Sequence, residues 1–344
     1  MTKTLLVMGG SHFLGRAVAV EALERGWQVH VFNRGRTGRN PHGVTALRGD
    51  RTDPAELRRL ASHGPWDAIV DTSGMDADAV DASTRALADV TQRYVYVSTV
   101  SVYAQWPMKP LTEDSPTLAA APAEGVPEDV NVAYGLDKAR CETSALRNLG
   151  SRLSILRPGV ILGPHENIGR LPWWLRRVAR GGRILAPGRP AQPIQPVDVR
   201  DVAAFACHRA QHADGHEVFN VAAPTGHSTM RDLLLACARA TGTSTGQAEL
   251  EWVDDSFLLS HDVRQWTELP LWRTYPATWQ VDGARARAQG LECRPLEQTV
   301  TDTWSWMTSG EAVLEHERAA RHGISEAKEA ALLEEWLRGG PRPH

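Results

Sequence analysis

Three side chains in the sequence have the types and the spacing of a proton-transfer site. Tyr134 and Lys138 stand four positions apart in the segment YGLDK, and Thr99 lies earlier, in STVSVYA. Residues at this spacing share one face of a helix, where a lysine ammonium lowers the pKa of a nearby phenol by its charge. We therefore predict that Tyr134 exchanges a proton with a hydroxyl or carbonyl oxygen, to which Thr99 also hydrogen-bonds.

A glycine-rich turn near the N-terminus predicts a dinucleotide-binding loop. In GGSHFLGR an apolar run ends at Gly9 and a helical pattern begins at Gly15, with Phe13 and Leu14 inside the turn. Glycines at these two places allow a tight turn and close packing of helix on strand, and the helix N-terminus attracts phosphate. His12 stands where a middle glycine is usual, and we expect it to lie outward and to donate a hydrogen bond to phosphate.

The residues after the next two predicted strands favour NADP(H) over NAD(H). WQVHVFN ends at Asn33, where NAD-binding units usually carry an acid for the ribose hydroxyls. Arg34 and Arg36 follow and are suited to clamp a 2′-phosphate, the alternative being a solvated basic turn. In GDRTD, Asp50 is placed to accept from the adenine amino group, or else only forms a turn, and Arg51 is assigned to the same cofactor site. Lys138 is also predicted to hold the nicotinamide ribose.

Short apolar runs alternate with helical patterns through the first half of the chain. This alternation predicts a parallel sheet covered by helices on both faces. We expect strands at 4–9, 27–33, 44–50, 67–74, 93–101 and 152–161, and helices at 16–25, after Asp53, at 79–90 and at 134–149. Ligands bind at the carboxyl ends of such strands. The residues at those ends are Gly9, Asn33, Asp50, Ser73, Thr99 and Pro158.

These motifs together resemble the short-chain dehydrogenase/reductase superfamily, and most closely its extended and atypical NAD-dependent epimerase/dehydratase branch. The resemblance rests on GGSHFLGR, GDRTD, STVSVYA, YGLDK, LRPGVILGP and PVDVRDVA, which span residues 9–203. It implies a Rossmann-type doubly wound α/β fold and hydride transfer assisted by Tyr134 and Lys138. It places the hydroxyl role on Thr99, with Ser98 and Ser101 as less favoured substitutes.

The resemblance also implies further cofactor and substrate contacts. The nicotinamide would pack near Pro158 and Val160, and the cofactor would be lined by Thr72, Ser73 and Gly74. Val160 and Arg200 depart from the Asn and the acid that are common in sugar-nucleotide enzymes. The predicted substrate is a carbonyl or secondary alcohol of a small metabolite or sugar derivative, turned over by reduction, oxidation or epimerisation. Dehydration is the less favoured alternative, because STVSVYA lacks the Asp-Glu that often follows the threonine in sugar dehydratases.

The chain is predicted to form a cofactor domain, a smaller lobe and a tail. Residues 1–165, with return segments near 194–222, would form the cofactor domain, 166–310 mainly the substrate lobe, and 311–344 a helical tail. The segments QPVDVRDVAAFA and HEVFNVAAP are the candidates to return to the sheet. GRLPWWLRRVARGGR is expected to bury its tryptophans and to leave most of its arginines solvated. In EAALLEEWLRGG, Leu332, Leu333, Trp336 and Leu337 are expected to form one docking face.

Composition limits the other possibilities. The 344 residues carry a formal net charge of −3, so nothing favours nucleic acid, and no apolar stretch is long enough to cross a bilayer. The four cysteines have no CxxC spacing, which indicates reduced thiols in the cytoplasm and no metal site. We expect a monomer or homodimer that takes a small-molecule substrate. The alternative is a non-catalytic nucleotide- or RNA-binding protein on the same fold.

Overall fold

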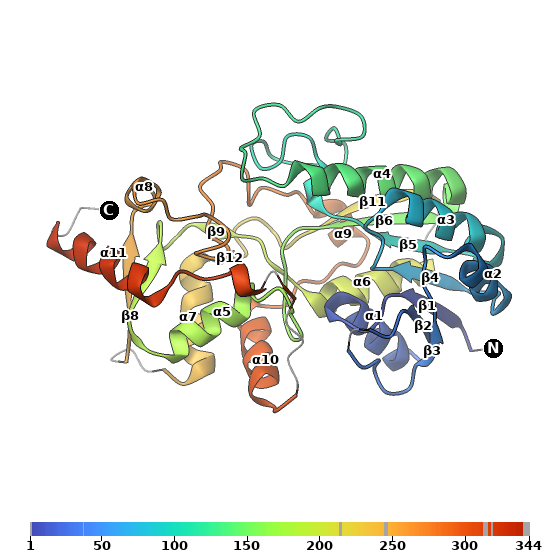
Figure 1. Ribbon diagram of the computed structural model, residues 1–344, viewed down its shortest axis with the longest axis horizontal. Helices are drawn as coiled ribbons and strands as arrows, with labels where there is room; N and C mark the ends of the chain where they lie inside the picture. The colour runs from blue at the N-terminus through green and yellow to red at the C-terminus, as the bar shows by residue number, and fades with distance from the viewer. Residues whose placement is uncertain are drawn as a thin grey trace. The chain divides into compact units, whose positions relative to one another are not determined.

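The computed structural model describes residues 2–36, 38–212, 215–243, 247–311, 316–317 and 319–339. Its contacts divide the chain into two compact units, which are described separately (Figure 1). Unit 1 comprises Met1–Ile161, Val197–Pro224 and Gln280–Cys293. Unit 2 comprises Leu162–Pro196, Thr225–Trp279 and Arg294–His344.

Unit 1 contains a seven-stranded sheet in the order β11-β6-β5-β4-β1-β2-β3, in which every pair of neighbours runs parallel. The strands are β1 Thr4–Met8, β2 Gln28–Asn33, β3 Thr45–Arg48, β4 Ala68–Asp71, β5 Tyr94–Val97, β6 Leu153–Pro158 and β11 Glu217–Val221. Strands β4, β5 and β6 are buried along their whole length, as expected where helices cover both faces. The predicted Rossmann-type parallel sheet is confirmed.

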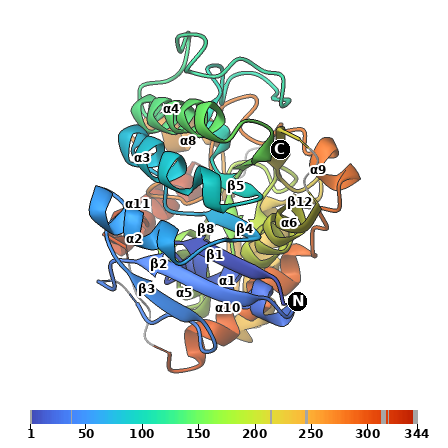
Figure 2. The same ribbon diagram turned by 90° about the vertical axis from the view of Figure 1, so that its right-hand side faces the viewer.

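Alternation along β1 sends its side chains to two different cores. Leu5 and Val7 pack in one cluster with helices α1 and α6, whereas Leu6 and Met8 pack in another with α2, α3 and α4 (Figure 2). The helices of unit 1 are α1 Phe13–Glu24, α2 Pro54–Ser62, α3 Ala77–Leu87, α4 Val132–Leu149, α6 Val199–His212 and α9 Ala284–Ala288, with single turns η1 Ala88–Val90, η2 Val100–Val102 and η3 Gly150–Arg152.

The chain reverses its direction of sheet growth at β1. Strands β2 and β3 are added on one side of β1, and β4, β5 and β6 on the other. Ligands of doubly wound sheets bind at this switch point, outside the carboxyl ends of the strands. The ends of β1 and β4 are therefore the place to look for a site.

One of the two expected return segments joins the seven-stranded sheet and the other does not. HEVFNVAAP supplies β11, which pairs with β6. QPVDVRDVAAFA forms the two-residue strand β10 Val197–Asp198 and then enters α6, so the prediction that it returns to the main sheet is wrong. Its apolar residues Val202 and Phe205 lie on the buried face of that helix. The prediction failed because a short apolar run fits a buried helix as well as a buried strand.

Helix α2 begins after Asp53, as predicted, but Asp53 and Glu56 do not form the capping box that their spacing of three would allow. Asp53 is the N-cap and its carboxylate accepts from the backbone N–H groups of Ala55 and Glu56. Glu56, however, accepts from the N–H of Asp50 and not from that of the cap residue. Its carboxylate therefore fastens the turn after β3 to the start of α2.

Unit 2 is built around three helices that contact one another, α5 Arg170–Ala179, α7 Met230–Thr241 and α10 Leu296–Thr308. Two strand pairs accompany them: β8 Gly182–Pro187 lies parallel to β13 Ala248–Val253, and β9 Pro193–Ile194 antiparallel to β12 Ser228–Thr229. The remaining elements of the chain are β7 Ile161–Leu162, α8 Asp255–Ser260, η4 Ala319–Arg321 and α11 Glu326–Arg338.

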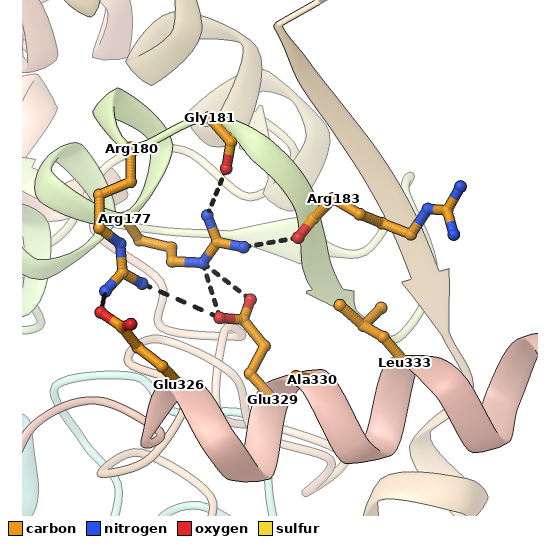
Figure 3. Close-up of a pocket in the computed structure, with 8 residues that line it drawn as sticks. All are labelled: Arg177, Arg180, Gly181, Arg183, Glu326, Glu329, Ala330 and Leu333. Carbon is orange, nitrogen blue, oxygen red and sulfur yellow. Dashed lines mark hydrogen bonds and ion pairs between the residues drawn. The ribbon is translucent and has the colours of Figure 1, made fainter.

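Helix α11 is held in unit 2 by a buried ion pair, whose two residues are among those that line a pocket (Figure 3). The Arg177 Nε lies 2.8 and 2.7 Å from the two carboxylate oxygens of Glu329, and its other nitrogens donate to the carbonyls of Gly181 and Arg183. Arg177 is thus an exception to the predicted solvation of this arginine-rich helix. On α11, Leu332, Leu333 and Trp336 are buried as predicted, whereas Leu337 is exposed.

Among the described residues, no helix is both long and apolar enough to cross a membrane.

Candidate functional site

The turn between β1 and α1 is packed against the end of β4. Thr72 donates through its N–H and its hydroxyl to the carbonyl of Met8, both at 3.1 Å. A Cβ on Gly9 would lie 2.8 Å from the Thr72 hydroxyl, and one on Gly15 would lie 2.7 Å from it and 2.6 Å from the Gly10 nitrogen. Only glycine fits these places, so the two predicted glycines have the packing roles assigned to them.

The N-terminus of α1 is the part of this turn that suits a phosphate group. His12 is the N-cap and makes no side-chain capping hydrogen bond, whereas Asp53, Asp76 and Asn131 cap α2, α3 and α4 with their side chains. The N–H groups in the first turn of a helix need acceptors from outside the helix. A first turn without a side-chain cap bond, after a glycine-rich strand end, therefore fits the pyrophosphate of a dinucleotide.

Three arginines gather at the ends of β2 and β3. Arg34 and Arg36 are exposed and close enough to Asp50 to lower its pKa, after the larger effect of hydrogen bonds from the Thr52 main chain and hydroxyl. The third, Arg48, bonds the Asn33 side-chain oxygen. Arg48 immediately precedes the GDRTD motif and was not among the residues predicted for the site.

Asn33 connects this basic cluster to the glycine turn. Its side-chain nitrogen donates to the Gly9 carbonyl at 2.9 Å, and its oxygen accepts from the Gly35 N–H at 3.0 Å. The side chain is therefore used to hold the two loops together. A contact between Asn33 and a ribose stays a prediction.

Helix α4, which carries Tyr134, approaches the turn after β5, which begins at Thr99, very closely. A Cβ on Gly135 would lie 2.0 Å from the carbonyl oxygen of Ser101, so this glycine lets α4 touch η2. Thr99 is the N-cap of η2 and accepts from the Ser101 N–H at 3.2 Å. Asn131 caps α4 through the Tyr134 N–H at 3.0 Å. Both side chains are half-buried.

Of the two serines near Thr99, each has a different environment. Ser101 lies within hydrogen-bond distance of Thr99, with 3.3 Å between the hydroxyl oxygens. The Ser98 hydroxyl is buried and has no hydrogen-bond partner among the described residues. Thr99 remains the predicted hydroxyl of the site.

The Lys138 side chain points into unit 1. Its Nζ donates to the carbonyls of Gly74 and Val97 at 2.6 and 2.8 Å, and to the Tyr96 hydroxyl at 2.6 Å. Burial lowers the pKa of Lys138 to about 8, against the opposing attraction of Asp71. Lys138 lies one helical turn after Tyr134 on α4, as the spacing predicts. Its ammonium lies beside Gly74, which follows β4, and beside Val97, which ends β5.

Arg51 also points inward, where it forms a buried pair with Asp71. Two of its nitrogens lie 3.0 and 2.8 Å from the Asp71 oxygens and also donate to the Ser73 and Ser83 hydroxyls. Burial by itself raises the pKa of Asp71, but the charge and hydrogen bonds of Arg51 bring it below its ordinary value. Arg51 thus positions Ser73, which is predicted to line the cofactor, and its own contact with cofactor stays a prediction.

The end of β6 supplies the remaining predicted contacts. Pro158 is the last residue of β6, the Gly159 N–H donates to the Val221 carbonyl at 3.1 Å, and the Val160 carbonyl accepts from the Val197 N–H at 2.8 Å. Val160 is half-buried. Sequence reasoning did not select Asp71 or Tyr96, whose signals were an acid ending the buried run AIVD and a tyrosine within YVYV.

The part of the chain that carries this site matches a known protein family. The sequence model of the NAD dependent epimerase/dehydratase family (Epimerase) matches residues 5–222, which include every residue of the predicted site. The chain belongs to the NAD dependent epimerase/dehydratase family. Family membership confirms the resemblance predicted from the motifs.

Two relatives of the chain are named for different activities, one for stem-loop binding and one for reduction. The chain is 27% identical to the chloroplast stem-loop binding protein of 41 kDa b of Arabidopsis thaliana, over 70% of this chain and 64% of that protein. It is 32% identical to the 2-alkyl-3-oxoalkanoate reductase of Stenotrophomonas maltophilia, over 54% of this chain and 58% of that protein. The chain thus spans less than two thirds of the length of either relative.

Among solved structures, the fold is similar to that of the Bordetella bronchiseptica enzyme WbmH in complex with NAD+. The two chains share 20% of their residues, the TM-score is 0.68, and the match covers 91% of this chain and all of the other. This likeness supports the fold.

Proposed function

We propose that the protein is an NADP(H)-preferring oxidoreductase that transfers hydride at a carbonyl or secondary alcohol of a small molecule. The observation that carries the proposal is the arrangement at the strand ends of unit 1. The first turn of α1, where His12 forms no side-chain cap bond, follows the glycine turn that Asn33 ties to Arg48, and Gly135 lets α4, which carries Tyr134, pack closely on η2, which begins after Thr99.

The cofactor preference follows from the charges after β2 and β3. Arg34, Arg36 and Arg48 offer guanidinium donors where NAD-selective sites carry a carboxylate for the ribose hydroxyls. Asp50 is the neighbouring acid, and its carboxylate would accept a hydrogen bond from the adenine amino group. Phosphates would lie at the first turn of α1, with the N–H groups of Phe13, Leu14 and Gly15.

The side chains of α4 and η2 handle the proton. When bound, the nicotinamide supplies or accepts the hydride. Tyr134 donates a proton to the substrate oxygen in reduction and accepts one in oxidation, and the hydroxyl of Thr99 fixes that oxygen by a hydrogen bond. The positive charge of Lys138 favours the phenolate of Tyr134. The reductase name of one relative favours reduction of a ketone as the direction for this chain.

Cofactor titration tests the proposal without a known substrate. We expect NADPH to bind more tightly than NADH, by nicotinamide fluorescence. Replacing Arg34 or Arg48 with Ala should weaken NADPH about tenfold by removing a charge-assisted hydrogen bond, and should leave NADH nearly unchanged. Arg140→Ala, which removes an exposed arginine of α4, is the matched control. Failure of wild-type protein to bind either cofactor would reject the proposal.

A substrate screen that follows NADPH oxidation then tests the chemistry. With any substrate found, Tyr134→Phe should lower kcat by about 10²- to 10⁴-fold, the usual contribution of a general acid, and should retain cofactor affinity. Full turnover by this variant would show that another group handles the proton.

The relative named as a stem-loop binding protein supports a second candidate function, binding of structured RNA. The same exposed arginines would then contact phosphates. An RNA stem-loop should in that case bind with an affinity that falls steeply with salt and should compete with NADPH. Binding of NADPH that the stem-loop does not affect favours the oxidoreductase.

A further inference from the structure

A buried arginine of β6 bonds to both elements that carry the predicted proton-transfer residues. The side chain of Arg157 is 7% exposed, and that of Glu142, on α4, is 8% exposed. The Nε and one terminal nitrogen of Arg157 lie 2.9 and 2.6 Å from the two carboxylate oxygens of Glu142. The other terminal nitrogen donates to the hydroxyl of Tyr103, the C-cap of η2, at 3.0 Å. One guanidinium therefore holds α4 and the end of η2 together.

Tyr103 in turn anchors the end of η2 to the sheet. Burial raises the pKa of its phenol to about 12, against the opposing effect of Arg157, so the hydroxyl keeps its proton. The hydroxyl donates to the Asn220 side-chain oxygen at 2.6 Å and accepts from Arg157. Asn220 is the residue of β11 that pairs with Arg157 in the register of the two strands. Two neighbouring strands thus fix one hydroxyl.

The other contacts between α4 and η2 do not fix the angle between these elements. Ala139 of α4 shares a small apolar cluster with Val102 of η2, and Gly135 lets α4 approach the Ser101 carbonyl. Apolar packing is non-directional, so α4 could still turn about this point of approach. The ion pair at Glu142 supplies a second attachment, about two helical turns further along α4. Its paired, charge-assisted bonds are directional.

We propose that Arg157 is a positioning residue, which fixes the angle of α4 against η2 and thereby sets Tyr134 relative to Thr99 for proton transfer. Tyr134 lies in the first turn of α4, and Thr99 is the N-cap of η2. A change in the angle between the two elements would therefore move one hydroxyl relative to the other. Arg157 acts through Glu142 and Tyr103, and the catalytic part of the proposal rests on the proposed function.

Replacing both members of the ion pair separates positioning from stability. Exchange of a buried pair for apolar residues of similar size is often neutral for stability, whereas removal of one member leaves a buried charge alone. The variant Arg157→Met/Glu142→Met removes the directional bonds and keeps the interior filled. We expect its urea midpoint to stay near that of the wild type, and the midpoint of Arg157→Met alone to fall.

Tyrosine NMR tests the positioning without a substrate. The chain has five tyrosines, and in protein with 13Cζ-labelled tyrosine the signal missing from Tyr134→Phe identifies Tyr134. We expect this signal to shift or broaden in Arg157→Met/Glu142→Met, because the ring meets different surroundings when the angle of α4 changes. The signals of Tyr94 and Tyr96, on the buried strand β5, should stay in place.

The ion pair of Arg209 with Glu217 is the matched control. It also lies in unit 1, its arginine side chain is 2% exposed, and it joins α6 to β11. Arg209→Met/Glu217→Met should leave the Tyr134 signal unchanged. An unchanged Tyr134 signal in Arg157→Met/Glu142→Met, or an equal change in the control, would overturn the proposal.

A conservative variant makes the same test if the double variant does not fold. Arg157→Lys keeps the charge but lacks the planar fork that reaches Glu142 and Tyr103 at once. The Tyr134 signal should move in this variant too, by less than in the double variant. An unchanged signal here, with the double variant unfolded, would equally overturn the proposal.

Kinetics complete the test with any substrate found by the NADPH screen. The double variant should lower kcat by roughly ten- to a hundredfold, because misplacement by about 1 Å is enough for such a loss. KM and NADPH affinity should stay near wild-type values, and Arg157→Lys should recover part of kcat. Wild-type kcat in the double variant would overturn the proposal. If NADPH does not bind while the Tyr134 signal still moves, the proposed function fails and the positioning by Arg157 stands.

Discussion

Two buried arginine–carboxylate pairs, one in each unit, have the same chemistry and different surroundings. In unit 1, Arg51 approaches Asp71 to 2.8 Å, and their side chains are 13% and 0% exposed. In unit 2, Arg177 approaches Glu329 to 2.7 Å, and theirs are 7% and 6% exposed. Such pairs add little net stability compared with apolar residues of the same size, yet are costly to break. Burial and distance alone do not distinguish their roles.

The residues that the two ion pairs contact distinguish the roles of the pairs. The remaining bonds of the first pair go to Ser73, Ser83 and Tyr94, around the strand ends where the cofactor is predicted to bind. The second pair bonds the backbone where α5 leads into β8, and so fastens α11 to unit 2. The contrast suggests that the first pair serves the site and the second only the fold.

Arg51→Met should have the largest effect. It leaves the Asp71 carboxylate buried without its cation, so the free energy of unfolding should fall by about 3–5 kcal/mol. Since Ser73 loses a partner, the fraction that remains folded should also bind NADPH more weakly. Urea denaturation and fluorescence titration measure the two effects. Unchanged NADPH affinity would remove the distinction between the pairs.

Arg177→Met should lower the free energy of unfolding by a similar amount and should leave cofactor binding unchanged. It isolates the buried Glu329 carboxylate, so we again expect about 3–5 kcal/mol in urea denaturation. NADPH affinity per folded molecule should equal that of the wild type. A loss of affinity comparable with that of Arg51→Met would contradict a purely structural role.

Lys138→Met should change how stability depends on pH. The folded-state pKa of Lys138, about 8, lies below its ordinary 10.5 because of burial, so between these values the unfolded chain binds more protons. Wild-type stability should therefore rise with pH across this window, by at most about 3 kcal/mol, and the variant should lack this contribution. Urea denaturation at pH 7.5 to 10.5 measures it, with the exposed Lys109→Met as control.

A pair of glycine substitutions should give the smallest effects. An alanine Cβ would lie 2.0 Å from the Ser101 carbonyl at position 135 and 2.7 Å from the Gln247 carbonyl at position 181. Both variants, Gly135→Ala and Gly181→Ala, should lose roughly 1–3 kcal/mol by overpacking. Only the first should lower kcat, because it separates α4 from η2. Equal kcat values in both would show that this approach does not position Tyr134.

Local sequence was sufficient for the sheet and for where the site lies. Buried apolar runs such as AIVD and YVYV can be satisfied in a parallel sheet covered on both sides, and their carboxyl ends bring Gly9, Thr72 and Thr99 to one edge. Asp53 was identifiable as a cap because its acceptor bonds reach only two and three residues along the chain. These properties depend on near neighbours, which the sequence shows directly.

The directions of the long charged side chains were decided only by tertiary structure. Arg51, Lys138 and Arg177 were each expected at a ligand or in solvent, yet each ends on partners far away in sequence, Asp71, Gly74 with Tyr96, and Glu329. A buried cation must find acceptors wherever the fold supplies them. Helical spacing states which face a residue occupies, and the packing of other elements determines what that face meets.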